Sequence, residues 1–389
     1  IKKASVAIIK NRFKMNIFEK ANDELENFII NHLDSYHKLR NYDFGLKDRS
    51  NISQISKYTS HRILNEYSVI EKLKKFDKKK KYTDEILWRL YWKGYLENYK
   101  SIWFEYTNFN EKSVTLEKIS SAIEGKTGID CFDSWIEELK ENNYLHNHSR
   151  MWFASIWIFK LMLPWQLGAR LFMRHLLDGD AASNTLSWRW VAGIHTNKKP
   201  YIATNGNIKK FTNNRFKDYL VNSSEKIKII KNNEHISNEL PVNRNKSMSK
   251  NLIIFDNDMD ITDRSDLFKS YSKVYFISNE IINSKFDFSL KVIRYKESLI
   301  QNVQKLIPNS IILNSIDIET ILANQSCIDV IYPGMGHNQD FINTFAHNNK
   351  IKINYIYRNE DLIYWKYANS GFYKFKKTFY KLNNIKFKQ

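Results

Sequence analysis

Polar and ionisable residues lie among several tryptophans in residues 144–216. Asn147 and Arg150 open a tryptophan-rich apolar run, an Asp-Gly-Asp turn follows at 178–180, and Asn184 comes next. Ionised side chains are rarely buried without partners, so this set would be unusual in an ordinary hydrophobic core. We therefore expect the segment to line a pocket for a large, flat cofactor with a polar edge.

Two serines, Ser53 and Ser56, stand three residues apart where a helix is expected to begin. Hydroxyl groups and backbone N–H groups at a helix N-terminus can bind an anion, because the helix dipole favours negative charge there. The alternative is that both serines are ordinary N-cap residues. The spacing alone leaves both interpretations open.

A third candidate group is Glu85, Trp88 and Arg89. Glu85 and Arg89 stand four residues apart, so they can pair on one face of a helix. Trp88 beside a carboxylate could instead stack on a nucleobase, as it does in proteins that bind flipped bases or single strands.

Several other patterns carry less chemistry. Residues 124–128 lack the first glycine of a phosphate-binding loop, because Ser120 stands in its place. Gly334 and Gly336 follow an apolar run and could belong to a ligand loop. The acidic residues of 256–260 could form a metal site or a nucleophile loop, although acidic clusters at strand ends are common. The histidines and the two cysteines lack the spacing of a metal site, so no metal is expected.

The composition suggests the class of partner. The chain has 389 residues and a formal net charge of +19. Such an excess of positive charge indicates an anionic partner, most often nucleic acid, or else a lysine-rich surface that is merely well solvated. The two cysteines exclude a disulfide framework and a four-cysteine iron–sulfur site within the chain. No run of 18 uncharged apolar residues occurs, and the first residues do not resemble a signal peptide, so we expect a cytoplasmic monomer without a membrane span.

The elements that must position these residues change in type along the chain. Residues 15–220 show helical spacing of apolar residues, 222–250 are polar and aperiodic, and short β-type runs appear from 251 onward. The expected strands are 252–255, 273–277, 310–313, 329–332 and 353–357, with helices such as 297–306 and 340–347 between them. Alternating strands and helices predict a small parallel, Rossmann-like α/β domain. The expected division is therefore a mainly α domain over 1–221, a linker over 222–250 and an α/β domain over 251–389.

The motifs of 15–220 together resemble one family, the DNA photolyase/cryptochrome flavoproteins, in their helical FAD-binding domain. The family patterns are N-x-x-R-M, D-G-D-x-x-x-N, W-x-W, E-x-x-W-R and a serine pair that holds the FAD phosphates. In this sequence they correspond to Asn147–Met151, Asp178–Asn184, Trp188–Trp190, Glu85–Arg89 and Ser53–Ser56, with Tyr42 where the family has an FAD-contacting tyrosine.

The resemblance implies a role for each matched residue. Cofactor contacts are expected from Tyr42, Ser53, Ser56, Arg89, Asn147, Arg150, Asp178, Asp180 and Asn184. The substrate cavity is expected to be lined by Glu85, Trp88, Asn147, Met151 and Trp190. Four residues are expected to take part in catalysis. Trp188 is the nearest electron donor to the flavin and Trp165 the next one. Asn184 faces the flavin N5, and Glu85 acts on the substrate. Arg150 and Asp178 are expected to form an ion pair beside the isoalloxazine.

The sequence also departs from the family pattern. The family usually begins with its α/β domain, whereas here the α/β domain comes second, so the chain resembles a permuted or shortened member. Residues 251–389 would then be a relic of the antenna domain or an unrelated module. Ala122 stands near the place of the distal tryptophan of the electron chain, Lys57 replaces a common proline, and His148 replaces a common arginine.

The expected activity is repair of cyclobutane pyrimidine dimers in damaged duplex DNA, driven by blue light through FAD. Photolyases of this kind are carbon–carbon lyases. Family members that repair (6-4) photoproducts carry histidine at the positions of Asn147 and Met151, so those lesions are not expected as substrates. The alternatives are a cryptochrome-like light sensor, or a DNA-binding flavoprotein without repair activity.

Overall fold

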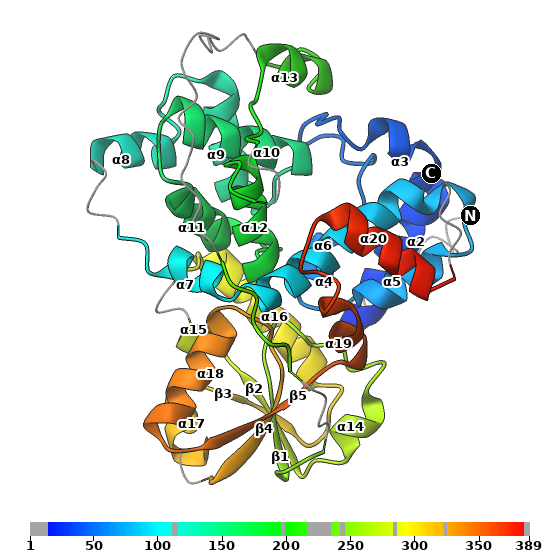
Figure 1. Cartoon of the computed structure of the whole chain (residues 1–389), viewed down its shortest axis with the longest axis vertical. Helices are drawn as coiled ribbons and strands as arrows, with labels where there is room; N and C mark the ends of the chain where they lie inside the picture. The colour runs from blue at the N-terminus through cyan, green and yellow to red at the C-terminus, as the bar shows by residue number, and fades with distance from the viewer. Residues whose placement is uncertain are drawn as a thin grey trace, which may run out of the picture.

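The structure is a computed structural model that describes residues 15–110, 116–195, 199–216, 235–241, 246–282, 286–322 and 325–384. A helical body lies on one side of the molecule and a smaller α/β body on the other (Figure 1). This arrangement confirms the predicted fold class. Most of the expected linker, 222–234 and 242–245, lies outside the described residues, as do residues 1–14 and 217–221. One described part of the linker, 235–241, contacts the helical body, where the Asn238 amide donates to the Asn98 carbonyl oxygen at 2.6 Å.

The helical body is built from amphipathic helices with local stop and start signals. The first described helix, α2, begins with a capping box between Asn16 and Glu19 and buries Phe18, Leu25 and Phe28 on one face. The α-helices of this body are α2 (Ile17–Asn31), α3 (Leu33–Leu39), α4 (Ser56–Thr59), α5 (Glu66–Leu73), α6 (Lys80–Asn98), α7 (Ser101–Thr107), α8 (Leu116–Glu124), α9 (Asp130–Asn142), α10 (Asn147–Ser155), α11 (Trp165–His175), α12 (Ala181–Val191) and α13 (Asn205–Phe211).

Three consecutive helices carry most of the motifs. The helix α10 begins where His146 accepts a hydrogen bond from the His148 amide, and it continues into a π-helical turn, Ile156–Lys160. Pro164 disfavours helical geometry in the residue before it, and α11 starts directly after it. Asp180 caps α12 by accepting from the Ser183 amide at 2.9 Å.

The α/β body contains a five-stranded sheet whose paired strands all run parallel, in the order β3-β2-β1-β4-β5. The strands are β1 (Asn251–Ile254), β2 (Lys273–Ile277), β3 (Ser310–Leu313), β4 (Cys327–Ile331) and β5 (Lys352–Ile356). The helices α14 (Ser265–Lys269), α15 (Asn279–Ile282), α16 (Leu290–Gln304), α17 (Ser315–Leu322) and α18 (His337–Asn348) connect or follow them. Helices on both faces of a parallel sheet explain why the strands are nearly continuous apolar runs.

The two faces of the sheet belong to different cores. Leu252 and Ile254 of β1 belong to the same hydrophobic cluster as the interior of the helical body. Ile253 and Phe255 point the other way and pack in a separate cluster with residues of β4 and α18. The α/β body is therefore packed against the helical body through one sheet face, since alternate residues of a strand face opposite sides.

The last two helices return to the helical body. They are α19 (Asn359–Trp365) and α20 (Phe372–Leu382), and α20 lies alongside α6 (Figure 1). Gly94 of α6 makes the close approach possible, because a Cβ at that position would lie 2.7 Å from the Ala368 Cβ. Lys376 of α20 forms a buried ion pair with Asp84 of α6 at 2.9 Å. In the described part of the chain, no helix combines the length and the apolar character that crossing a bilayer requires.

Candidate functional site

A cavity of about 410 Å³ lies in the helical body between α6, α10, α11 and α12. It is large enough for part of a sizeable organic ligand. Eleven of the residues predicted from the sequence line it: Glu85, Trp88, Arg89, Asn147, Arg150, Met151, Asp178, Asp180, Asn184, Trp188 and Trp190. Residues from four helices and one turn thus meet around a single space.

The expected ion pair between Arg150 and Asp178 is present. Arg150 Nη2 lies 2.9 Å from Asp178 Oδ2, and Arg150 Nε donates to the Leu145 carbonyl oxygen at 2.9 Å. Burial alone would raise the pKa of Asp178, but Arg150, followed by a hydrogen bond from Ser56, outweighs burial and holds that pKa below its usual value. Asp178 is therefore an anion, and Ser56 lies beside it.

Asp180 and Arg89 form the second ion pair of the cavity wall. Asp180 also accepts from the Ser183 amide and from the Ser183 hydroxyl at 2.8 Å. The predicted pairing of Arg89 with Glu85 is wrong, because Arg89 reaches the N-terminus of α12 instead. Glu85 lies 3.6 Å from Arg40 Nε. Asp180 accepts hydrogen bonds from the N-terminus of α12 and pairs with the Arg89 guanidinium at the same time. Glu85, in the middle of α6, has no helix N-terminus beside it.

Glu85 differs electrostatically from the two aspartates. Burial raises its pKa above the ordinary glutamate value, and the Arg40 guanidinium only partly offsets this effect. Its neighbour Trp88 stacks on Phe372 of α20, with ring centroids 3.7 Å apart and the planes 9° from parallel. The C-terminal helix therefore supports the wall of the cavity on this side.

Asn184 and Trp188 occupy fixed positions on α12. Asn184 donates through Nδ2 to the Ala169 carbonyl oxygen at 2.8 Å, which holds its amide in place. A Cβ at position 168 would lie 2.2 Å from the Trp188 ring, so only glycine leaves room for that indole. The indole Nε1 of Trp188 is buried and has no hydrogen-bond partner among the described residues.

Four predicted residues do not line the cavity. Tyr42 packs between Phe44 and Phe211, with centroids 5.5 and 5.0 Å away. Ser53 lies beside Tyr82, whose pKa the Ser53 hydroxyl lowers against the larger effect of burial. Trp165 and Ser56 complete the four.

The two serines do not cap α4 with their side chains. The N-cap of α4 is Ile55, and no side-chain capping hydrogen bond is present there. The N-cap interpretation is therefore wrong for both Ser53 and Ser56.

The aromatic neighbours of the two electron-chain candidates differ. Trp165 stacks on Tyr106 at 5.5 Å, whereas Trp157 lies edge-on to Trp188 at 6.3 Å. Ala122, near the place expected for the distal tryptophan of the electron chain, is buried. The structure thus places Trp157 in ring contact with Trp188.

Some residues of the cavity were not predicted. Ser183, Ser187 and Val191 share the face of α12 with Asn184 and Trp188, so helical spacing could have indicated them. Gly179 belongs to the Asp-Gly-Asp motif, whereas nothing in the sequence signalled the remaining lining residues, Arg40, Asn41, Trp92, Ala154, Phe172 and Leu176.

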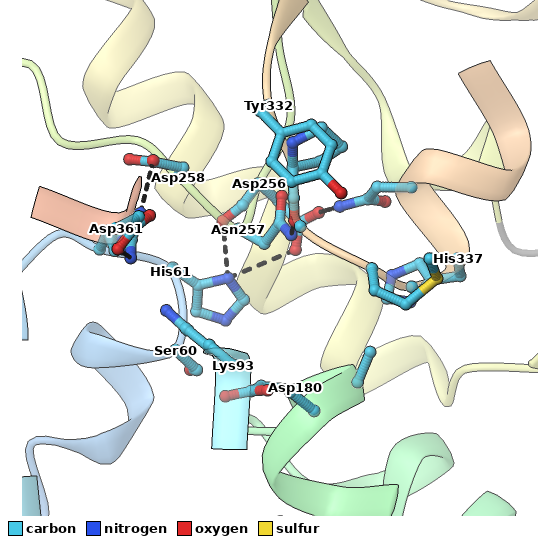
Figure 2. A pocket seen from close by; sticks show the side chains of 18 of the residues that line it. Ser60, His61, Lys93, Asp180, Asp256, Asn257, Asp258, Tyr332, His337 and Asp361 are labelled. Carbon is cyan, nitrogen blue, oxygen red and sulfur yellow. Dashed lines mark hydrogen bonds and ion pairs between the residues drawn. The ribbon is translucent and has the colours of Figure 1, made fainter. Parts of the chain in front are cut away.

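A second, much smaller pocket of about 50 Å³ lies between the helical body and the carboxyl ends of β1 and β4 (Figure 2). Asp256, which follows β1, accepts from Lys296 Nζ at 3.1 Å and from Asn338 Nδ2 at 3.0 Å, and it lies 3.3 Å from His61 Nδ1. These partners hold the pKa of Asp256 well below its usual value despite burial. Burial lowers the pKa of the nearby His337 to about 3, so that imidazole is neutral.

The acidic residues of 256–260 are structural ion-pair partners. Asp258 Oδ2 lies 2.9 Å from Arg62 Nη1, and Asp258 Oδ1 lies 2.7 Å from Arg264. Asp260 pairs with Arg358 at 3.0 Å. The carboxylates of Asp258 and Asp260 are therefore engaged with cationic side chains. No group of three or more potential metal ligands occurs within the described ranges.

The loop with Gly334 and Gly336 contacts the helical body. A Cβ at Gly336 would lie 2.7 Å from the Ala181 Cβ, so this glycine allows the start of α18 to approach the start of α12. The loop that could have been a ligand loop thus belongs to the contact region between the two bodies. We call this region, which includes the small pocket and the ion pairs of Asp256, Asp258 and Asp260, the joint.

The large cavity fits a flat aromatic cofactor with a polar edge. Its walls combine aromatic side chains with two ion pairs and a fixed amide, and the buried Trp188 Nε1 is an unused donor. An unused buried donor is costly unless something binds it.

Comparisons with known proteins agree with this chemistry. Residues 82–217 match the family model described as the FAD binding domain of DNA photolyase. The deoxyribodipyrimidine photo-lyase of Buchnera aphidicola subsp. Baizongia pistaciae is 28% identical over 210 residues, which are 49% of this chain and 42% of that protein. The enzyme of the same name from Escherichia coli K12 is 29% identical over 126 residues, 30% of this chain and 26% of that one.

Among solved structures, a Synechocystis cryptochrome shares 21% identity with a TM-score of 0.45, covering 50% of this chain and 43% of its own. The chain spans less than half the length of these relatives. The matched family model identifies the segment that forms most of the cavity as an FAD-binding domain. In this segment the chain is similar to the DNA photolyases.

Proposed function

We propose that the protein repairs cyclobutane pyrimidine dimers in DNA by light-driven electron transfer. The observation that carries the proposal is the convergence of eleven motif residues on one cavity. Reduced FAD, when bound, supplies the excited electron that enters the dimer and later returns, so no net redox change occurs. The chain itself binds, orients and shields the reacting groups.

The polar groups of the cavity divide into two sets. Arg150 with Asp178, and Arg89 with Asp180, present fixed charges on the side proposed for the isoalloxazine. Asn184, held by the Ala169 carbonyl, is proposed to face the flavin N5. Because these groups are already oriented by the protein, they need no rearrangement when the cofactor binds.

Glu85 is proposed to act on the substrate. Burial raises the pKa of its carboxyl, which favours the protonated form that can donate a hydrogen bond to a dimer that has gained negative charge. Trp88 and Trp190 would contact the extruded bases. Asn147 and Met151 do not titrate near neutral pH, which favours cyclobutane dimers over (6-4) photoproducts, whose repair needs a proton donor.

The partner is proposed to be damaged duplex DNA. The net charge of +19 suits binding to phosphates. A damaged dinucleotide is also easier to extrude than an intact pair, because less stacking and pairing is lost. Affinity should therefore fall steeply as salt concentration rises.

The decisive experiment measures repair of an oligonucleotide containing one cyclobutane dimer, in blue light and in darkness. We expect yellow protein with one FAD per chain and repair in light only. Glu85→Ala should slow repair while FAD stays bound, and Glu85→Gln, which keeps a hydrogen-bond donor, should retain more activity. Colourless protein that cannot be reconstituted with FAD, or repair of a (6-4) oligonucleotide, would refute the proposal.

A light-sensing role is the second candidate. The broken chain of electron-donating tryptophans favours this role, because Ala122 stands where the distal tryptophan is expected and Trp165 stacks on Tyr106. A sensor should change its flavin state in light yet leave dimers intact and bind duplex DNA weakly. The same oligonucleotide assay, with a salt titration of DNA binding, therefore separates the two functions.

A further inference from the structure

One buried side chain connects the α/β body directly to the wall of the large cavity. His61 follows α4, is 1% exposed and lies between the two bodies (Figure 2). Its Nδ1 lies 2.8 Å from the carbonyl oxygen of Asp256, at the end of β1, and its Nε2 lies 3.1 Å from the carbonyl oxygen of Leu177. Leu177 directly precedes the Asp178–Asp180 turn.

Both atoms that face the imidazole nitrogens are carbonyl oxygens, which only accept hydrogen bonds. A ring nitrogen that carries a proton can donate to the carbonyl oxygen that it faces, so the imidazole bridges the two backbone segments. Asp256 Oδ2 also lies 3.3 Å from Nδ1. Asp256 is in turn held by Lys296 and Asn338.

The backbone before the turn is held from a second side as well. The Leu177 amide donates to the Asn143 carbonyl oxygen at 3.0 Å, and the Gly179 amide donates to the Leu176 carbonyl oxygen at 3.1 Å. On the far side of the turn, the close contact of Gly336 with Ala181 presses the start of α18 against the start of α12. The turn that carries Asp178 and Asp180 therefore lies between His61, which links Leu177 to Asp256 of the α/β body, and the contact of Gly336 with Ala181.

We infer that His61 is a positioning residue through which the α/β body fixes the Asp178–Asp180 turn of the flavin cavity. The inference rests on the proposed role of that turn in holding FAD. Without His61 the Leu177 carbonyl loses this contact, and the turn with its two ion pairs loses its link to Asp256 of the α/β body. The α/β body is then part of the flavin site and not only a neighbouring module.

The test compares His61→Leu and His61→Gln with the control Tyr67→Phe, all in the full chain. Tyr67 donates to Asp361 Oδ1 at 3.0 Å, so the control removes a hydrogen bond of the same joint without touching the turn. FAD affinity is measured by fluorescence titration of apoprotein, and the flavin environment by visible circular dichroism of the bound cofactor.

We expect His61→Leu to weaken FAD binding by about tenfold, the upper factor for losing one ordinary hydrogen bond, and to change the dichroism. His61→Gln can still donate to one of the two carbonyls and should lie between that variant and the wild type. Tyr67→Phe should match the wild type in both measurements. Wild-type affinity and dichroism in both His61 variants would overturn the inference.

Two complications have defined outcomes. If His61→Leu does not fold, the comparison of His61→Gln with Tyr67→Phe decides. If the wild type does not bind FAD, the proposed function fails, and the inference is tested by hydrogen exchange at the amides of Leu177 and Gly179. Faster exchange in His61→Gln than in Tyr67→Phe supports the positioning role, and equal exchange refutes it.

Discussion

The large cavity and the small pocket between the two bodies share Gly179 and Asp180 but are built on opposite principles. The cavity has about 410 Å³ of space, aromatic walls and a buried indole donor without a partner. The small pocket has about 50 Å³, and cations pair with Asp256 and Asp258 in its wall. Free volume characterises a ligand site, whereas close charge pairing characterises a structural joint.

The carboxyl groups show the same contrast. Cations hold the pKa values of Asp256 and Asp258 far below the ordinary range, although burial opposes them. Burial wins at Glu85 and Glu138 of the helical body, where it raises the pKa above the usual glutamate value. Paired charges thus surround the aspartates after β1, whereas the helical body contains Glu138, whose pKa of about 7 lets it change protonation near neutral pH.

The largest expected effect is on the joint. Arg62→Leu removes the cation shared by Glu66, Asp258 and Asp361, which lie 3.2, 2.9 and 2.7 Å from it. Three buried carboxylates would lose their common partner, so the free energy of unfolding should fall by roughly 3–5 kcal/mol in denaturant titrations. As a control, Arg174→Leu breaks an exposed pair with Asp287 and should cost about 1 kcal/mol or less. Equal losses in the two variants would contradict the contrast.

The second prediction concerns the cavity. Asp178→Asn leaves Arg150 without its anionic partner, and the expected loss of roughly 2–5 kcal/mol should appear mainly as lost FAD affinity. The measurement is FAD content after purification and affinity on reconstitution. Glu124→Gln, in an exposed pair with Lys126, serves as the control and should purify fully yellow. Normal affinity in Asp178→Asn would show that the ion pair does not hold the cofactor.

The third prediction tests the electron path. Trp188→Phe should keep FAD bound and slow light-driven flavin reduction by at least an order of magnitude, because the nearest oxidisable ring is removed. Absorbance at the flavin band under steady blue light gives the rate. Trp135→Phe changes a buried indole that stacks on Trp152, away from the cavity lining, and should reduce at the wild-type rate.

Gly168→Ala sharpens this prediction without changing any aromatic residue. The added methyl group would lie 2.2 Å from the Trp188 ring and must displace it. We expect slower photoreduction than in the wild type, with the protein still folded. A wild-type rate in Gly168→Ala would mean that the exact place of the Trp188 ring does not matter.

The smallest expected effect is a pH dependence. Burial raises the pKa of Glu138 to about 7 from the ordinary 4.5, with Arg49 only partly opposing it. The folded state therefore binds this proton more tightly, so the stabilisation is complete below about pH 4.5 and is lost as pH rises through 7. The loss is at most about 1.4 kcal/mol per pH unit in that window.

Glu138→Gln should remove this slope in denaturant titrations between those pH values. Asp258 contributes no slope there, since the stability from its depressed pKa is lost only as pH falls below the ordinary aspartate range. An unchanged slope in Glu138→Gln would assign the titration to another group.

Local signals in the sequence predicted much of the architecture. The strands 273–277 and 310–313 were predicted with their observed ends, because buried parallel strands are continuous apolar runs bounded by polar residues. The motif residues of α10 and α12 were predicted to face one cavity, and they do so because helical spacing brings residues three and four apart to one face. The division into 1–221, 222–250 and 251–389 remains a prediction.

Contacts between distant segments were decided only by the tertiary structure. Arg89 pairs with Asp180, 91 positions away, and His61 reaches Asp256 across 195 positions. Phe372, near the end of the chain, stacks on Trp88. No local pattern encodes such partners, because spacing along a helix or strand reports only which face a residue occupies. The choice of partner depends on which faces the packed helices and the sheet bring together, and on the cost of leaving a buried charge unmatched.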